Sequence, residues 1–172
     1  MAALVVDTNV AVVANSGSRQ ASDTCFLVCV ERLGRITSDE DKLVLDDMWR
    51  IIKEYQNNLQ PSGKQPGIGE AFLKWVLTNR ENPQRCDLIR INQMGNDDTE
   101  FVEFPDSPEL DGFDRSDRKF VAVALSHPDN PTILQAVDSK WWPFRHSLQA
   151  SGVSVEFICE DDIERLYRSR AE

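Results

Sequence analysis

The chain has no stretch of about 18 consecutive apolar residues, the length that a membrane-spanning helix requires. Its first residues also lack the pattern of a secretory signal, in which a positively charged segment leads into an apolar run and a small-residue cleavage site. We therefore expect a cytoplasmic protein without membrane partners. With 172 residues and no internal repeat or low-complexity segment, the sequence predicts one domain over residues 1–172.

Cysteine and histidine are scarce. The chain has four cysteines and two histidines, and no C-x-x-C pair, so the sequence offers no complete zinc site of the usual spacing. We predict that Cys25, Cys29, Cys86 and Cys159 are free and mostly buried thiols. Two further catalytic patterns are not evident: a nucleophilic Ser or Cys arranged with a His, and a Gly-rich phosphate loop of the P-loop type. This argues against the enzyme classes that depend on them.

Basic residues are outnumbered, with 19 Lys and Arg against 29 Asp and Glu and a net charge of −10. This balance argues against a protein whose whole surface binds nucleic acid, because phosphate binding depends on clustered Lys and Arg. The distribution is uneven: residues 96–114 contain eight acids and no base. Basic residues that could form a local rim follow soon after this segment: Arg115, Arg118, Lys119, Lys140 and Arg145.

Short apolar runs alternate with stretches of helical periodicity. Strands are predicted at residues 4–6, 42–47, 132–137 and 153–158, and helices at 22–34, 47–59, 69–80, 117–127, 144–151 and from 161 onwards. Gly34 is expected to end the first helix, and Phe26, Leu27, Val30 and Leu33 to form its apolar face, as Met48, Ile51, Ile52 and Tyr55 do in the second. Two β-rich runs, "LIRI" and "EFVEF", flank "MGNDD" and predict a hairpin. This order indicates an α/β fold with a mostly parallel sheet covered on both faces.

Two acids follow predicted strands directly. Asp7 ends "LVVD" and Asp138 ends "ILQAVD", so both are expected at the carboxyl edge of the sheet, where such folds bind ligands. Each acid also has a structural alternative. Asp7 and Asp138 could cap helices, Asp114 and Asp117 could be a cap with an acid in the first turn, and Glu54 could be a solvated residue beside the apolar face of its helix.

Taken together, Asp7, Glu54, Asp117 and Asp138 indicate a metal site, because clustered carboxylates raise one another's pKa unless a cation neutralises them. Magnesium or manganese is the natural partner of an oxygen-only site. Such ions activate water and stabilise charge on a phosphodiester during hydrolysis. Trp141 and Trp142 follow the last acid and are expected to be packed in the core or an interface, with stacking on an unpaired base as the alternative.

The four acidic segments, "LVVDTNV", "IIKEY", "DRKFVAVAL" and "AVDSKWW", resemble in order and spacing the motifs of PIN-domain nucleases. The resemblance spans residues 4 to about 160 and implies a three-layer α/β/α sandwich that cleaves RNA, usually single-stranded, with a divalent metal. It implies Asp7, Glu54, Asp117 and Asp138 as the acidic ligands. Thr8, Asn9 and Ser139 would support the site, with Asp114 as an extra ligand or, as we favour, a cap.

Residues 87–114 depart from the family pattern and are interpreted as a hairpin and acidic-loop insertion. Many small members of the family are toxins of toxin–antitoxin pairs and are shorter than this chain, so an inhibitor protein is an alternative partner beside RNA, as is a second copy of the chain. The acidic net charge requires an offset at the site, for which Arg115, Arg118, Lys140 and Arg145 are candidates. The alternative function is a non-catalytic PIN-like module that binds RNA or protein.

Overall fold

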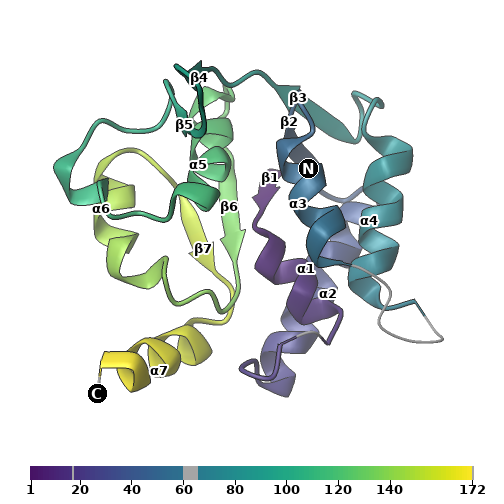
Figure 1. Ribbon diagram of the computed structural model, residues 1–172. Helices are drawn as coiled ribbons and strands as arrows, with labels where there is room; N and C mark the ends of the chain where they lie inside the picture. The colour runs from purple at the N-terminus through teal and green to yellow at the C-terminus, as the bar shows by residue number, and fades with distance from the viewer. Residues whose placement is uncertain (17, 60–65, 172) are drawn as a thin grey trace.

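A computed structural model describes residues 1–16, 18–59 and 66–171. Its centre is a five-stranded parallel sheet in the order β3-β2-β1-β6-β7 (Figure 1). The strands are β1 (Ala3–Val6), β2 (Lys42–Asp46), β3 (Cys86–Ile89), β6 (Thr132–Gln135) and β7 (Val155–Phe157). Because every strand runs in the same direction, all five carboxyl ends meet at one edge of the sheet.

Helices cover both faces of the sheet. On one side lie α1 (Thr8–Ala14), α2 (Asp23–Thr37), α3 (Arg50–Asn58) and α4 (Ile68–Asn79), and on the other α5 (Arg118–Ser126) and α6 (Arg145–Ala150) (Figure 1). The terminal helix α7 (Glu160–Ala171) follows β7, and three short 3-10 helices, η1 (Pro108–Leu110), η2 (Arg115–Asp117) and η3 (Trp142–Phe144), lie in the connections. The predicted three-layer α/β/α sandwich is confirmed. Within the described ranges, no helix is long and apolar enough to cross a bilayer.

The central strands are buried on both faces, which explains their unbroken apolar sequences. Leu4 of β1 pairs with Leu43 of β2 and with Thr132 of β6, and Val5 and Val6 have no exposed surface. A strand covered by helices on both sides cannot alternate apolar with polar residues, because each side chain enters one of two cores. The apolar run therefore ends where the strand leaves the sheet, and the first polar residues lie at its carboxyl edge.

The predicted hairpin is displaced by several residues. The run "LIRI" does not form it, because β3 pairs in parallel with β2, with Leu45 opposite Leu88. The hairpin consists instead of β4 (Gln93–Met94) and β5 (Asp97–Phe101), which turn at Gly95, whose φ of 59° suits glycine. The first residues of the expected insertion at 87–114 thus belong to the central sheet.

Three expectations about the helices were wrong. Gly34 does not end α2, which continues to Thr37 and so buries Ile36 beside the core. Leu27 is 63% exposed, because the buried face of α2 runs through its two cysteines. Met48 precedes α3 and is 65% exposed, so it is not part of that helix's apolar face. The short helix α1 was not predicted; its seven residues are too few for a clear periodic pattern.

The prediction of four free thiols is half right. Cys29 and Cys86 are free and buried, whereas Cys25 and Cys159 form a disulfide. The fold brings the first turn of α2 beside the start of α7, so the two Cα atoms lie 5.3 Å apart across a sequence separation of 134 residues. Their spacing along the chain does not indicate this contact. It forms only because the long segment between the two cysteines folds and returns the chain to α2.

Candidate functional site

Asp7 leaves the sheet at the end of β1 and begins α1. Its side chain caps that helix by accepting a hydrogen bond from the backbone N–H of Asn9 at 3.0 Å, so the capping alternative is also correct. The carboxyl is only 3% exposed. Burial raises its pKa well above the usual value, and the charges of Asp117, Glu54 and Asp138 raise it further. Asp7 therefore has a structural role and lies within a field of like charge.

Glu54 lies on α3 and is partly buried, so it is not a solvated flank. The Thr8 hydroxyl donates a hydrogen bond to its carboxylate, which links the start of α1 to α3. Lys119 of α5 places its Nζ 2.8 Å from Glu54 Oε1 and also donates to the carbonyl of Ser116. Glu54 thus carries an internal counter-charge from the opposite helical layer. From the sequence, Lys119 was only a candidate for the basic rim and was not expected to pair with an acid of the site.

Asp117 ends η2 directly before α5 and is 7% exposed. Its Oδ2 accepts a hydrogen bond from the indole Nε1 of Trp141 at 3.1 Å. Burial, together with the charges of Asp138, Glu54 and Asp114, raises the pKa of Asp117 to about 7. A carboxyl that would be ionised in water is therefore half protonated near neutral pH when no cation is bound.

Asp114 is a cap, as favoured from the sequence. Its Oδ1 accepts from the backbone N–H of Ser116 at 2.9 Å at the start of η2. Its other oxygen lies 3.0 Å from Lys140 Nζ. Together these contacts lower the pKa of Asp114 although burial raises it. Asp114 therefore has its own donor and counter-charge.

Asp138 follows β6 and is partly exposed. Burial raises its pKa, while a hydrogen bond of 3.2 Å from the Lys140 backbone N–H to Oδ1 opposes the increase. The loop that carries Asp138 is fixed to the first motif, because Asn9 Oδ1 accepts a 2.7 Å hydrogen bond from the Val137 N–H. Ser139 beside it is buried. Asn9 thus supports the site by joining the ends of two adjacent strands.

Two supporting residues were missed from the sequence. Tyr55 was assigned to an apolar helix face, yet its buried hydroxyl donates a 2.6 Å hydrogen bond to the carbonyl of Val6, next to Asp7. Gln135 Oε1 accepts from the Asp138 N–H at 3.1 Å, while its buried Nε2 has no hydrogen-bond partner among the described residues. The hydrogen bond of Tyr55 could have been expected from the residue type, because the hydroxyl of a buried tyrosine usually has a hydrogen-bond partner.

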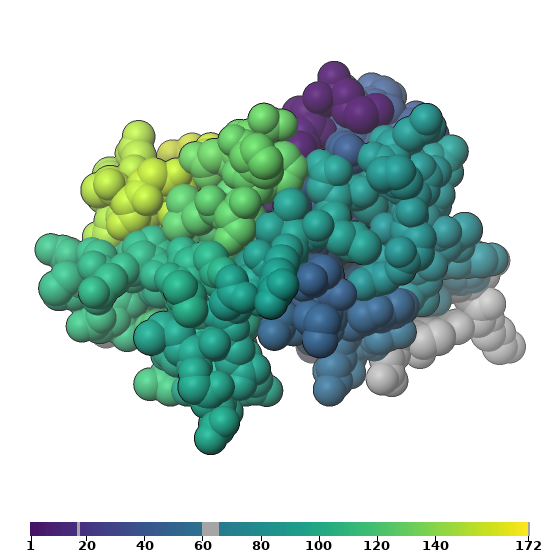
Figure 2. Space-filling view, turned by 90° about the horizontal axis from the view of Figure 1, so that it is seen from above, coloured from purple at the N-terminus to yellow at the C-terminus, as the bar shows by residue number. Residues whose placement is uncertain are grey.

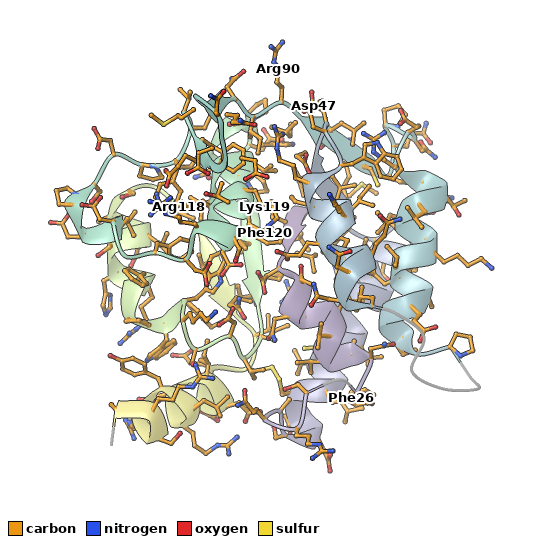
Figure 3. The ribbon with its side chains drawn as sticks, in the orientation of Figure 1. Phe26, Asp47, Arg90, Arg118, Lys119 and Phe120 are labelled. Carbon is orange, nitrogen blue, oxygen red and sulfur yellow. A yellow bond between two sulfur atoms is a disulfide. The ribbon has the colours of Figure 1, made fainter. Side chains whose placement is uncertain are left out.

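The expected basic rim is reduced by internal contacts. Arg118 is 7% exposed, lies 3.0 Å from Glu100, and donates to the carbonyls of Asp111 and Phe113, so it is part of the folded loop and not of an accessible rim. Arg118 and its neighbour Lys119 point to different sides of α5 (Figure 3). Arg145 lies over the Trp142 ring, with 4.0 Å from its guanidinium carbon to the ring centroid.

Arg115 and Lys140 remain accessible. The Arg115 side chain is 65% exposed although it lies 3.1 Å from Asp97. Arg115 and Lys119 also line a cavity of about 360 Å³ beside the acidic site. The hairpin forms one wall of this cavity and the start of α3 the other, and the two segments adjoin in Figure 2. The remaining lining residues are Met48, Trp49, Arg50, Lys53, Asp98, Thr99, Phe101 and Ser116.

The donors of the candidate site are carboxylate oxygens that raise one another's pKa, and hard divalent cations prefer oxygen ligands. In the described part of the chain, no three of these acids bring an oxygen each within 4.8 Å of one another; only Cys25, Cys29 and Cys159 meet that distance. Magnesium ligands lie roughly 3 Å apart, so the acids must turn inward to share an ion.

Scans against protein-family models, the curated proteins and the solved structures find no match to this chain.

Proposed function

We propose that the chain is a metal-dependent endoribonuclease that hydrolyses phosphodiester bonds, with single-stranded RNA as its substrate. The observation that carries the proposal is the shared electrostatics of the carboxyl edge. There, Asp7, Asp117 and Asp138 all have raised pKa values, and Glu54 contributes to the increase at Asp7 and Asp117. The resemblance of the four acidic segments to PIN-domain nucleases supports the same reading.

Asp7, Glu54, Asp117 and Asp138 would hold Mg²⁺ or Mn²⁺. When bound, such an ion supplies an activated water and stabilises negative charge on the phosphodiester. The residues of the chain provide the geometry. Trp141 holds the Asp117 carboxylate through its indole N–H, and Asn9 holds the loop before Asp138. Tyr55 fixes the backbone that leads into Asp7.

Lys119 has a separate part in this proposal. In the structure its ammonium neutralises Glu54, which would otherwise face other carboxylates without a counter-charge. A divalent ion held by the acids would supply the positive charge that Lys119 now provides. Lys119 also lines the adjoining cavity, where its ammonium would be able to contact a phosphate.

The cavity beside the acids supplies the remaining substrate contacts in this proposal. Beside Lys119, its cations Arg50, Lys53 and Arg115 would hold phosphates. Arg115 belonged to the rim expected from the sequence, whereas the buried Arg118 contacts no phosphate in this proposal. Trp49 is exposed and has Arg80 stacked at 4.5 Å on its ring, so one face of the indole is already covered. Phe101 anchors the hairpin wall beneath Arg50, 5.2 Å from its guanidinium carbon.

Cleavage of a labelled single-stranded RNA in Mg²⁺ or Mn²⁺ tests the proposal. The wild-type chain should cleave, lose activity on chelation and regain it when metal is restored, whereas Asp7→Asn should be inactive and folded. Asp41→Asn is the matched control, because Asp41 is also a buried carboxylate but pairs with Arg35 far from the acidic edge. Full activity with verified metal removal, or wild-type rates in Asp7→Asn, would overturn the proposal.

One observation favours a second candidate, a non-catalytic module that binds RNA or protein. The acidic cluster is partly satisfied from within, since Lys119 neutralises Glu54 and Trp141 donates to Asp117. Under this alternative no metal is needed, and magnesium should not change the thermal stability of the chain. RNA binding without cleavage, unaffected by chelation, would select this candidate.

We further propose the cytoplasm as the compartment, where the RNA substrate is present, and retain an inhibitor protein and a second copy of the chain as candidate partners. An inhibitor that blocks the acidic edge should carry basic side chains, because the edge presents several carboxylates. Co-expression with the product of a neighbouring short reading frame, followed by a cleavage assay, tests this partner.

A further inference from the structure

A second group of metal-type ligands lies away from the acidic edge, between the first and last parts of the chain. Cys25 and Cys29 are one turn apart on α2, and Cys159 lies in the turn directly before α7. The three sulfur atoms all lie within 4.8 Å of one another. Cys25 and Cys159 are joined as a disulfide, and Cys29 is the free thiol beside them.

We propose that, once the disulfide is reduced, Cys25, Cys29 and Cys159 bind one thiophilic cation of the Zn²⁺ class. Thiolates are preferred ligands of Zn²⁺, which also occurs with three protein ligands and a water in the fourth position, and this site is independent of the oxygen ligands proposed for magnesium. The oxidised and metal-bound states exclude each other, because the bonded sulfurs cannot both act as thiolate ligands.

The sulfur positions are close to what a tetrahedral ion requires. With Zn–S bonds of about 2.3 Å, ligand sulfurs lie roughly 3.8 Å apart. Cys25 and Cys159 are bonded to each other and Cys29 lies within 4.8 Å of both, so only the reduced pair must move apart to reach this spacing. Cys159 is in a turn and not inside a helix or strand, so this part of the backbone can accommodate the shift.

A carboxylate and an opening to solvent lie beside the three sulfurs. Burial, together with the carboxylate of Asp162, raises the pKa of the Cys29 thiol to about 12, so a bound cation would have to displace its proton. A cavity of about 320 Å³ is lined by Cys25, Cys159 and Asp162, and it gives an ion a route to the buried cluster. Asp162 lies in the first turn of α7 and accepts a hydrogen bond from the Ser22 N–H at 2.7 Å.

The chemistry balances with a dithiol as reductant. The disulfide accepts two electrons and two protons from the dithiol, whose own sulfurs become a disulfide, and Cys25 and Cys159 become thiols. Binding of Zn²⁺ then displaces the three thiol protons into water and leaves a complex with one net negative charge. A water in the fourth position completes the tetrahedron. The α2 and α7 N-termini, which carry partial positive charge, lie beside two of the three sulfurs.

Cobalt titration of the full chain tests the proposal, because thiolate ligation gives Co²⁺ an intense charge-transfer absorption that carboxylate ligation does not. The chain is reduced with a dithiol, freed of it without air, and titrated with Co²⁺; added Zn²⁺ should displace the cobalt. We expect one thiolate-ligated ion per reduced chain and none in the oxidised chain. If the acidic edge binds no metal and the chain does not cleave RNA, the cobalt–thiolate signal should be unchanged. The nuclease proposal and the three-cysteine proposal can therefore fail separately.

Cys29→Ser keeps both disulfide partners and should weaken Co²⁺ binding at least 10-fold, since loss of a ligand costs more than loss of an outer contact. Cys159→Ser is a second test in a less buried turn, and Cys86→Ser is the control, because Cys86 is a buried thiol outside the cluster. No charge-transfer band in the reduced chain, an equal band in Cys29→Ser, or a disulfide that resists reduction in the folded chain would overturn the proposal.

Discussion

The indole Nε1 of Trp141 donates a 3.1 Å hydrogen bond to the Asp117 carboxylate, and both side chains are buried. The bond joins the loop after β6 to the start of α5, so two of the four acidic segments are held together by a residue outside the acid set. A buried carboxylate with one good donor keeps a fixed orientation. The tryptophan therefore contributes to the site through packing and through this one N–H group.

Trp141→Phe should destabilise the chain by about 1–3 kcal/mol, because it leaves the Asp117 oxygen without its donor in a buried position. Urea unfolding of the variant measures this loss. Trp142→Phe is the matched control, because the ring of Trp142 packs on Phe157 and the substitution removes the same aromatic volume. An equal loss in both variants would show that ring packing, and not the hydrogen bond, accounts for the effect.

The metal-free chain should lose stability as pH rises from about 4 to about 7. The pKa of Asp117 is about 7 in the folded chain and lies near its ordinary value when unfolded, so the folded state binds more protons in this interval. The stability that protonated Asp117 contributes is therefore fully present at low pH and is lost as pH rises through the pKa of the folded state. Unfolding in chelator at about pH 5 and about pH 8 measures the difference.

Asp117→Asn should reduce that pH dependence, because its amide does not titrate, while Asp7 and Asp138 retain theirs. Saturating magnesium should reverse the trend, because the ion binds the ionised carboxylates. Identical pH profiles for wild type and Asp117→Asn would contradict the assignment of a raised pKa to this residue.

Lys119→Met should make the chain more dependent on divalent metal. The substitution keeps the length of the side chain but leaves Glu54 without its counter-charge among other acids. We expect a lower melting temperature in chelator and a larger rise on adding Mn²⁺ than in wild type. Lys74→Met on α4 serves as a control for the loss of a lysine elsewhere. A metal response equal to that of wild type would contradict a shared role of Lys119 and the ion in neutralising the acids.

Neutralising the cavity cations should weaken RNA binding. Lys53→Gln and Arg115→Gln should each lower affinity and reduce its salt dependence by about one counterion per lost phosphate contact. Arg118→Gln is expected to destabilise the loop it anchors without this change in salt slope, because its guanidinium is buried on Glu100 and backbone carbonyls. Binding isotherms over a range of salt concentrations separate the two effects. Unchanged slopes in both cavity variants would remove the cavity from the substrate path.

The acidic segment should screen the cavity through Asp98 in particular. Asp97 and Glu100 already contact Arg115, whereas Asp98 is exposed and lines the cavity. Asp98→Asn should therefore bind RNA more tightly at low salt and lose that advantage at about 0.1 M and above, where exposed charges are screened within about 10 Å. Asp106→Asn, in the same segment but away from the cavity, should have no effect. Equal affinity at low salt would rule out screening by Asp98.

The sequence by itself determined the architecture and the edge at which the acids gather. Apolar runs ending in Asp7 and near Asp138 predicted parallel strands buried on both faces, and parallel strands bring their carboxyl ends together whatever the loops do. The cap role of Asp114 was predictable for a similar reason, since capping depends on residues close in sequence.

Only the tertiary structure decided which side chains meet across that edge. Nothing in the sequence pairs Lys119 with Glu54, Trp141 with Asp117 or Cys25 with Cys159, because each pair joins elements from distant parts of the chain. Arg118 was a candidate for the basic rim because it follows the acidic segment, whereas in the fold it is buried against Glu100. Sequence patterns of a few residues predict strands, helix caps and the edge of the sheet at which strands end. Contacts between distant side chains depend on how the helices pack on the sheet, which no local sequence pattern specifies.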